Sequence, residues 1–161
     1  GSIHREYEFL KTESMKIYYK SKLAKILTFL ADFTTMMFFG VVITERKKLS
    51  GRTISHEGTH IKQYWDIVQL GFAISVLIFL PCFLYDVTSW WMLSLIIIPF
   101  ILYYIIYGVE YLYWRCKGYK SHDAYLRVGF ERQANYIEET WWEPDNLSNN
   151  YEIFGWWKKL K

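Results

Sequence analysis

The chain has 161 residues, of which 52% are apolar and 20% aromatic, and its formal net charge is +3. The apolar share is above that of an ordinary soluble domain and favours a membrane protein, while so small a net charge gives no electrostatic case for nucleic-acid binding. The length predicts one domain over residues 1–161. At the start, Gly1-Ser2 without an initiator methionine resembles a cleavage scar and carries no fold information.

The first apolar stretch runs from Leu23 to Ile43 and includes charged side chains at Lys25 and Asp32. A full span here would put the N-terminus outside the membrane, against the four lysines within residues 11–22, so we expect an interfacial or re-entrant helix. The overlapping residues 39–46, FGVVITER, are rich in β-branched side chains. They are either the end of that helix or a short edge strand.

The most informative motif is HExxH, which occupies residues 56–60. Residues four apart share one face of a helix, so His56 and His60 can offer two imidazole nitrogens to one zinc ion. Glu57 then lies beside the open coordination position, where it can accept a proton from water. The alternative is a surface helical turn with two solvated histidines.

Two long uncharged segments follow the motif, at residues 67–85 and 89–109. A helix needs about 20 apolar residues to cross the hydrocarbon core, so both are candidate transmembrane spans. Only residues 86–88 separate them, and they therefore predict a tight antiparallel hairpin.

Charge then orients this hairpin. The tip carries Asp86 and no Lys or Arg, whereas basic residues flank both spans. The positive-inside rule places the flanks in the cytoplasm. HExxH and everything after the second span are therefore expected on the cytoplasmic side of the membrane.

A cytoplasmic helix is predicted at about residues 122–139, with Arg127, Glu131, Asn135 and Glu138 on one face. Glu131 can return to the membrane surface that holds HExxH and is our preferred third metal ligand. Glu110, close to the inner end of the second span, is the alternative. His122 is either a donor to an oxyanion, and so a catalytic residue, or a polar residue at a helix start.

These residues support a resemblance to a known family. HExxH followed by a distant helical glutamate resembles the gluzincin metallopeptidases, whose membrane members include the CAAX proteases and the sensor-transducer proteases of β-lactam resistance. The matching residues are His56, Glu57, His60, Glu131 and Ala134. Residues 38–137 are also similar to a family of small bacterial integral-membrane proteins.

The resemblance implies a Zn²⁺ cofactor and a strand over residues 39–46 that pairs with an extended peptide substrate. The chain departs from the family at Asn135, where gluzincins usually carry Asp. A neutral amide accepts a hydrogen bond from a ligand histidine less strongly than a carboxylate does.

Taken together, the sequence predicts an all-α membrane protein: a transmembrane helical hairpin with interfacial helices, with or without a short edge strand before the HExxH helix. The expected function is zinc-dependent hydrolysis of a peptide or membrane-protein substrate at the cytoplasmic face of a bacterial inner membrane. Its partners would be this substrate and the lipid bilayer, with the oligomeric state left open. The alternatives are a signalling or scaffold protein with a structural or vestigial zinc site, and a zinc hydrolase of a lipid-linked substrate.

Overall fold

The computed structural model describes residues 15–31, 34–87, 89–143 and 145–159. The chain is mostly helical and also contains a small three-stranded sheet. It divides into two compact units. The first, here called the sheet unit, combines the described parts of Gly1–Lys62 and Gly129–Lys161, and the second, the hairpin unit, is Gln63–Val128.

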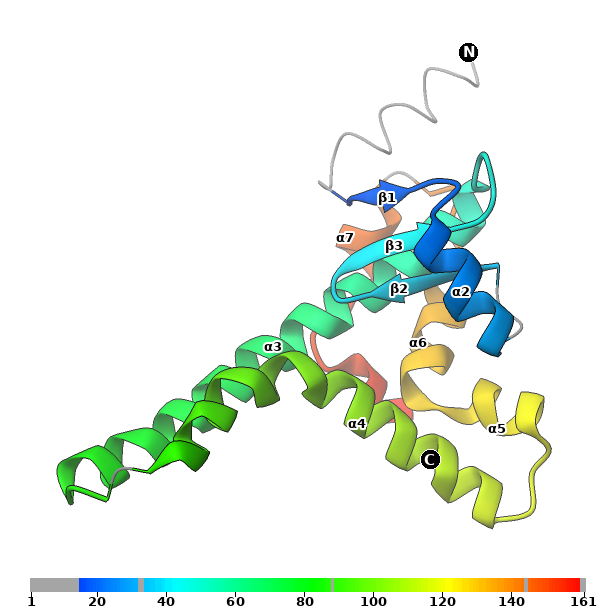
Figure 1. The fold of residues 1–161 in the computed structure, drawn as a ribbon. Coiled ribbons are helices and arrows are strands. Elements are labelled where there is room, and N and C mark those ends of the chain that lie inside the picture. Colours follow the sequence, from blue (N-terminus) through cyan, green and yellow to red (C-terminus); the bar gives the residue numbers. More distant parts are fainter. Residues whose placement is uncertain (1–14, 32–33, 88, 144, 160–161) are drawn as a thin grey trace. The chain divides into compact units, whose positions relative to one another are not determined.

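The sheet unit begins with four short elements: β1 (Ile17–Tyr18), α2 (Lys22–Ala31), β2 (Thr35–Phe38) and β3 (Val41–Thr44). β3 is the central strand, parallel to β1 and antiparallel to β2 (Figure 1). Phe39 and Gly40 join β2 to β3 with φ angles of 47° and 79°. Positive φ at both positions suits a two-residue hairpin, because its twist then matches that of the strands.

This arrangement corrects three predictions. The expected helix over Leu23–Ile43 ends at Ala31, and the β-branched residues after it form the hairpin instead. Ten helical residues rise only about 15 Å, which is half of a bilayer core. The chain is mostly helical, as predicted, but the all-α class has to be amended because a small sheet is present. The strand that the sequence allowed before the HExxH helix is present as β3, although β3 has neighbours on both sides and β2 is the strand at the edge.

The sheet packs on the first turns of the HExxH helix. This helix is α3 (Gly51–Leu84), whose residues up to Lys62 belong to the sheet unit. Val42 of β3, Leu49 and Ile54 form a buried apolar cluster, against which Ile17 and Ile61 also pack. Removing these apolar side chains from water fixes the start of α3 against one face of the sheet.

The C-terminal part of the sheet unit consists of α6 (Gly129–Glu138), α7 (Asn146–Asn150) and the 3₁₀ turn η2 (Gly155–Lys159). Phe130 of α6 packs on Trp156, with ring centroids 4.5 Å apart. Asn146 joins two elements: its amide donates to the Ile137 carbonyl at 2.8 Å, and its side-chain oxygen accepts from the Ser55 hydroxyl at 2.8 Å. These buried hydrogen bonds hold α6 beside α3.

The single helix predicted over residues 122–139 is broken. Val128 has φ −57° and ψ 129°, an extended conformation that ends α5 (Ser121–Arg127) before α6 begins. Arg127 therefore does not lie on the helical face that carries Glu131 and Glu138. Those two residues remain together on α6.

The hairpin unit contains the rest of α3, the 3₁₀ turn η1 (Trp90–Leu93), α4 (Ser94–Cys116) and α5. α3, and η1 with α4, are long and apolar enough to cross a membrane, so the two long apolar helices predicted at 67–85 and 89–109 are present. A Cβ on Gly71 would lie 2.7 Å from Cα of Pro99, so the two helices approach closely there. Ser75 strengthens the contact by donating to the Leu95 carbonyl at 2.8 Å.

Candidate metal centre

The two motif histidines lie on one side of α3, within the sheet unit. They are one helical turn apart, and their Nε2 atoms are separated by 3.1 Å. This is the arrangement that the four-residue spacing predicts. His60 is buried and His56 is partly buried, so both imidazoles are largely withdrawn from water.

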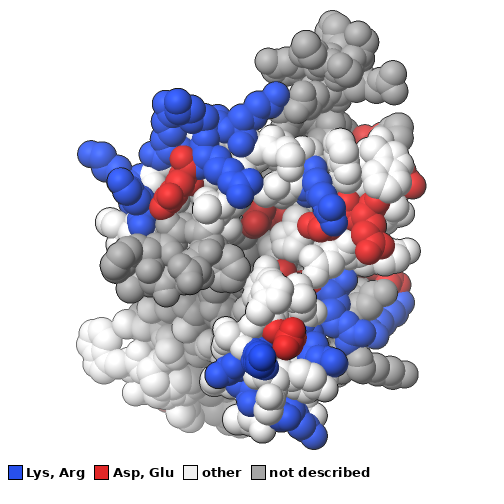
Figure 2. Space-filling model, turned by 90° about the vertical axis from the view of Figure 1, so that its right-hand side faces the viewer, with Lys and Arg blue, Asp and Glu red and all other residues white. Residues whose placement is uncertain are grey.

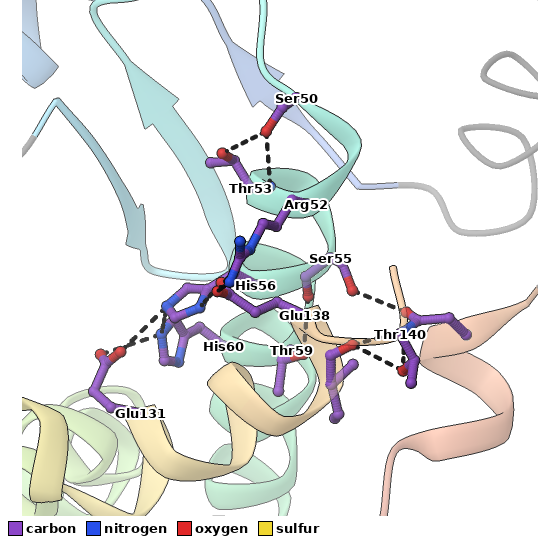
Figure 3. Close-up of polar contacts among 12 residues, drawn as sticks. Ser50, Arg52, Thr53, Ser55, His56, Thr59, His60, Glu131, Glu138 and Thr140 are labelled. Atoms are coloured by element: carbon purple, nitrogen blue, oxygen red, sulfur yellow. Dashed lines mark hydrogen bonds and ion pairs between the residues drawn. The ribbon is translucent and has the colours of Figure 1, made fainter. Parts of the chain in front are cut away.

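Glu131 of α6 completes the group (Figure 3). Its Oε2 lies 3.2 Å from Nε2 of His56, and its Oε1 lies 3.2 Å from Nε2 of His60. The three side chains could hold a metal ion. Glu110, the alternative ligand, belongs to α4 in the hairpin unit and is not a member of this group.

The spacing of the three ligand atoms fits a tetrahedral ion. Bonds of 2.0–2.1 Å at tetrahedral angles would place neighbouring ligand atoms about 3.3 Å apart. The observed separations are 3.1 Å between the two nitrogens and 3.2 Å from each nitrogen to the carboxylate. Among the described residues the group offers three ligands, one fewer than a closed structural zinc site has.

Glu138 is the functional residue that sequence reasoning missed. Its Oε2 lies 2.8 Å from Nδ1 of His56, and its Oε1 accepts from Nε and Nη2 of Arg52 at 2.9 and 2.8 Å. If Nδ1 carries the proton of a neutral imidazole, Nε2 of His56 presents a lone pair toward His60 and Glu131. If Nε2 of His60 is likewise unprotonated, three electron-pair donors converge here, and a bound cation would interact favourably with all three.

The signal for Glu138 was present in the sequence. Glu138 follows Glu131 by seven residues, which is two helical turns, and it had been placed on the same face. The family resemblance instead drew attention to position 135, four residues after Glu131. In the structure the Asn135 side chain makes no hydrogen bond to any described residue, so Glu138 supplies the carboxylate that Asn135 lacks.

Glu57 is buried on the same turn of α3. Burial raises the pKa of its carboxyl group, because the charged form loses hydration, and the charges of His60 and then His56 oppose this rise. The backbone of Met37 in β2 also hydrogen-bonds to Glu57. Thus the candidate base is linked directly to the edge strand of the sheet.

The strand register explains why Met37 faces the site. Glu45 N donates to Thr34 O at 3.1 Å, so hydrogen-bonded pairs alternate along the hairpin and the pair Met37–Val42 is not one of them. The N–H and C=O of Met37 therefore point away from β3. The outer edge of β2 at the buried Met37 thus faces Glu57 of α3.

Glu131 shows the opposite electrostatic behaviour from Glu57. Burial would raise the pKa of Glu131, but the attraction of His60, together with hydrogen bonds from both imidazoles, outweighs it and lowers the pKa below its usual range. Glu131 is therefore ionised, as a metal ligand must be. The pKa values of these two neighbouring carboxyl groups are therefore shifted in opposite directions.

His122, the other candidate catalytic residue, lies in the hairpin unit. It is exposed in the first turn of α5, and its ring stacks on Tyr125 with centroids 6.4 Å apart. Its role as an oxyanion donor stays a prediction.

Comparison of the chain with family models, curated proteins and solved structures finds no match.

Proposed function

We propose that this chain is a zinc-dependent membrane peptidase of the gluzincin type. The observation that supports it best is the convergence of His56, His60 and Glu131 on one point, beside a buried Glu57. This set provides three ligands of the types that catalytic zinc uses, together with a separate carboxylate in position to act as a base. The two candidate spans agree with a membrane location.

Each residue of the site has a distinct part in the proposed reaction. His56, His60 and Glu131 would hold the ion, and Glu138 would keep Nδ1 of His56 protonated. A zinc ion bound there supplies Lewis-acid chemistry, which stabilises negative charge on a carbonyl oxygen and lowers the pKa of water. Glu57 would accept the proton of the attacking water and donate it to the amine that leaves.

The edge of β2 suits an extended peptide. The main chain of Met37 points away from β3 at this edge, and its N–H donates to the Glu57 carboxylate. A substrate strand added there would be recognised through its main chain, independently of its side chains. Because Met37 also hydrogen-bonds to Glu57, such a strand would pass beside the base.

The side of the membrane follows from charge. The tip between the spans carries Asp86 without Lys or Arg, and basic residues flank the spans. By the positive-inside rule the metal centre faces the cytoplasm, and we propose a bacterial inner membrane as its location.

The test compares one carboxylate of the site with one outside it. Glu57→Gln should keep its zinc and lose hydrolysis by about 10²- to 10⁴-fold, the usual contribution of a general base. Glu139→Gln, an exposed residue at the end of α6, is the matched control and should leave both unchanged. Zinc is measured by mass spectrometry of the purified full chain, and hydrolysis with a library of internally quenched peptides.

Three results would contradict the proposal. Loss of zinc from Glu57→Gln would make Glu57 a ligand rather than the base. A fourth protein ligand in the metal-loaded protein would leave no position for water and would favour a structural zinc site in a signalling or scaffold protein. Cleavage of a lipid-linked compound in place of every peptide would favour the lipid hydrolase.

A further inference from the structure

A basic surface lies where α2 begins and β3 ends. Ser21 N donates to Thr44 O at 3.1 Å, which brings the start of α2 beside the end of β3. As a result, the exposed Lys20 and Lys22 approach the exposed Arg46 and Lys47 from a different part of the chain. Figure 2 shows lysine and arginine side chains gathered in the upper part of one face of the molecule.

Large apolar side chains are exposed at the same place. Tyr18 is 54% exposed, and on α2 Leu23 is 43% and Ile26 is 62% exposed, whereas Ala24 is fully buried. Leu23 and Ile26 are three residues apart and therefore share a face of the helix. α2 thus packs through Ala24 on the sheet unit and presents apolar side chains outward.

We propose that this surface, formed by Tyr18, Lys20, Lys22, Leu23, Ile26, Arg46 and Lys47, docks on anionic lipid headgroups. An amphipathic helix with basic residues beside its apolar face lies in the plane of a bilayer, where the apolar side chains enter the acyl boundary and the lysines meet phosphates. An anionic bilayer satisfies both groups of side chains at once. A zwitterionic one satisfies only the apolar group.

Two observations favour lipid as the partner of this surface: its positive charge complements anionic headgroups, and the hairpin unit contains two helices apolar enough to span a membrane. An acidic protein could also bind these basic side chains, but it would have to reach them by diffusion from solution. The two apolar helices of the hairpin unit hold the chain at a bilayer, so lipid headgroups are present at very high effective concentration. The docking proposal is independent of the peptidase proposal, because none of the residues in this surface belongs to the metal centre.

The experiment measures the depth of residue 26 in a bilayer. The full chain carries Cys82→Ser and Cys116→Ser, and a fluorescent label is attached at Ile26→Cys. It is placed in nanodiscs of phosphatidylcholine alone or with phosphatidylglycerol, each containing lipids spin-labelled in the acyl chain. We expect quenching of the label to increase strongly in the anionic discs, and added salt to reverse the increase.

Charge reversal supplies the second arm. Lys22→Glu with Lys47→Glu should lower the ratio of docked to undocked protein by more than about 25-fold, because losing each lysine alone accounts for about fivefold and the new carboxylates are also repelled by anionic headgroups. Lys158→Glu, at the exposed C-terminal end, is the control and should have no effect. A label at Ser148→Cys on α7 should stay unquenched in both kinds of disc.

Several outcomes would overturn the docking proposal. Equal quenching of residue 26 in zwitterionic and anionic discs, unchanged by the double reversal, would remove the role of headgroup charge. Absence of quenching in both kinds of disc would show that residue 26 does not enter a bilayer, and would favour another partner such as an acidic protein. Circular dichroism of the reversed variant, whose two altered residues are exposed, separates either result from loss of folding.

Discussion

Glu138 provides the sharpest test of the metal centre, because it touches His56 without touching the ligand atoms. We expect Glu138→Gln to weaken zinc binding by about tenfold and Glu138→Ala by up to about 100-fold, the range seen when such outer carboxylates are removed. A glutamine oxygen can still accept from Nδ1 of His56, but its amide then faces the donors of Arg52. Alanine leaves Nδ1 with no acceptor at all.

The magnitude follows from the contacts. The bond between Glu138 and His56 is 2.8 Å long, and the Glu138 side chain is 18% exposed. A hydrogen bond to a charged group in such a place contributes about 1.5–3 kcal/mol, which corresponds to about 10- to 150-fold in affinity. Arg52 is 61% exposed, so Arg52→Gln should weaken zinc binding by less than Glu138→Gln does.

The assay is competition for zinc between the full chain and a chromophoric chelator at one fixed pH. Asn135→Ala is the control that distinguishes this structure from the usual gluzincin pattern, and it should leave the affinity unchanged. The nitrogen chemical shifts of the His56 ring provide a readout that a general loss of stability would not reproduce. The reasoning fails if Glu138→Gln binds zinc like the unmodified protein while Asn135→Ala does not.

Four further predictions concern the candidate metal ligands and the two long apolar helices. His56→Ala should abolish zinc co-purification, measured by mass spectrometry, and retention of one zinc per chain would refute the site. Glu131→Gln should weaken zinc binding, because a neutral amide is a poorer ligand than a carboxylate. An unchanged dissociation constant would mean that a residue other than Glu131 is the third ligand. Gly71→Ala should destabilise the helical hairpin by about 1–3 kcal/mol, since the added Cβ meets the Pro99 backbone at 2.7 Å, and a thermal midpoint equal to that of the parent would contradict this. A cysteine at Val87, in a chain without native cysteines, should react with an impermeant reagent outside intact cells, whereas labelling only after lysis would reverse the topology.

The parts of this protein that follow from local periodicity were predictable. Two imidazoles four residues apart share a helical face, and a long uncharged run identifies a helix able to span a membrane. Glu131 also emerged from sequence, because few acidic side chains lie on a helix that can return to the motif. These features depend on spacing within one element.

The remaining features depend on contacts between elements. The stretch after Ala31 is apolar enough for a helix, but β-branched residues and the left-handed turn at Phe39 and Gly40 favour a hairpin once β1 is available as a partner. The break between α5 and α6 falls at Val128, which is neither Pro nor Gly, so the residue type there does not predict it. The contact of Glu138 with His56 could not be predicted, because it depends on which face of α6 packs toward α3, and the hydrogen bonds of Asn146 determine that packing.

The metal ligands come from two stretches of chain that the hairpin unit separates. α3 supplies His56 and His60 early in synthesis, but α6, with Glu131, emerges only after both apolar helices. The ligand set is thus completed last, once the hairpin has been made, and its closure joins the two stretches of the sheet unit across that long insertion. A chain interrupted before residue 129 would carry the motif without its third ligand. The order of synthesis thereby delays completion of the candidate metal centre until both long apolar helices have been made.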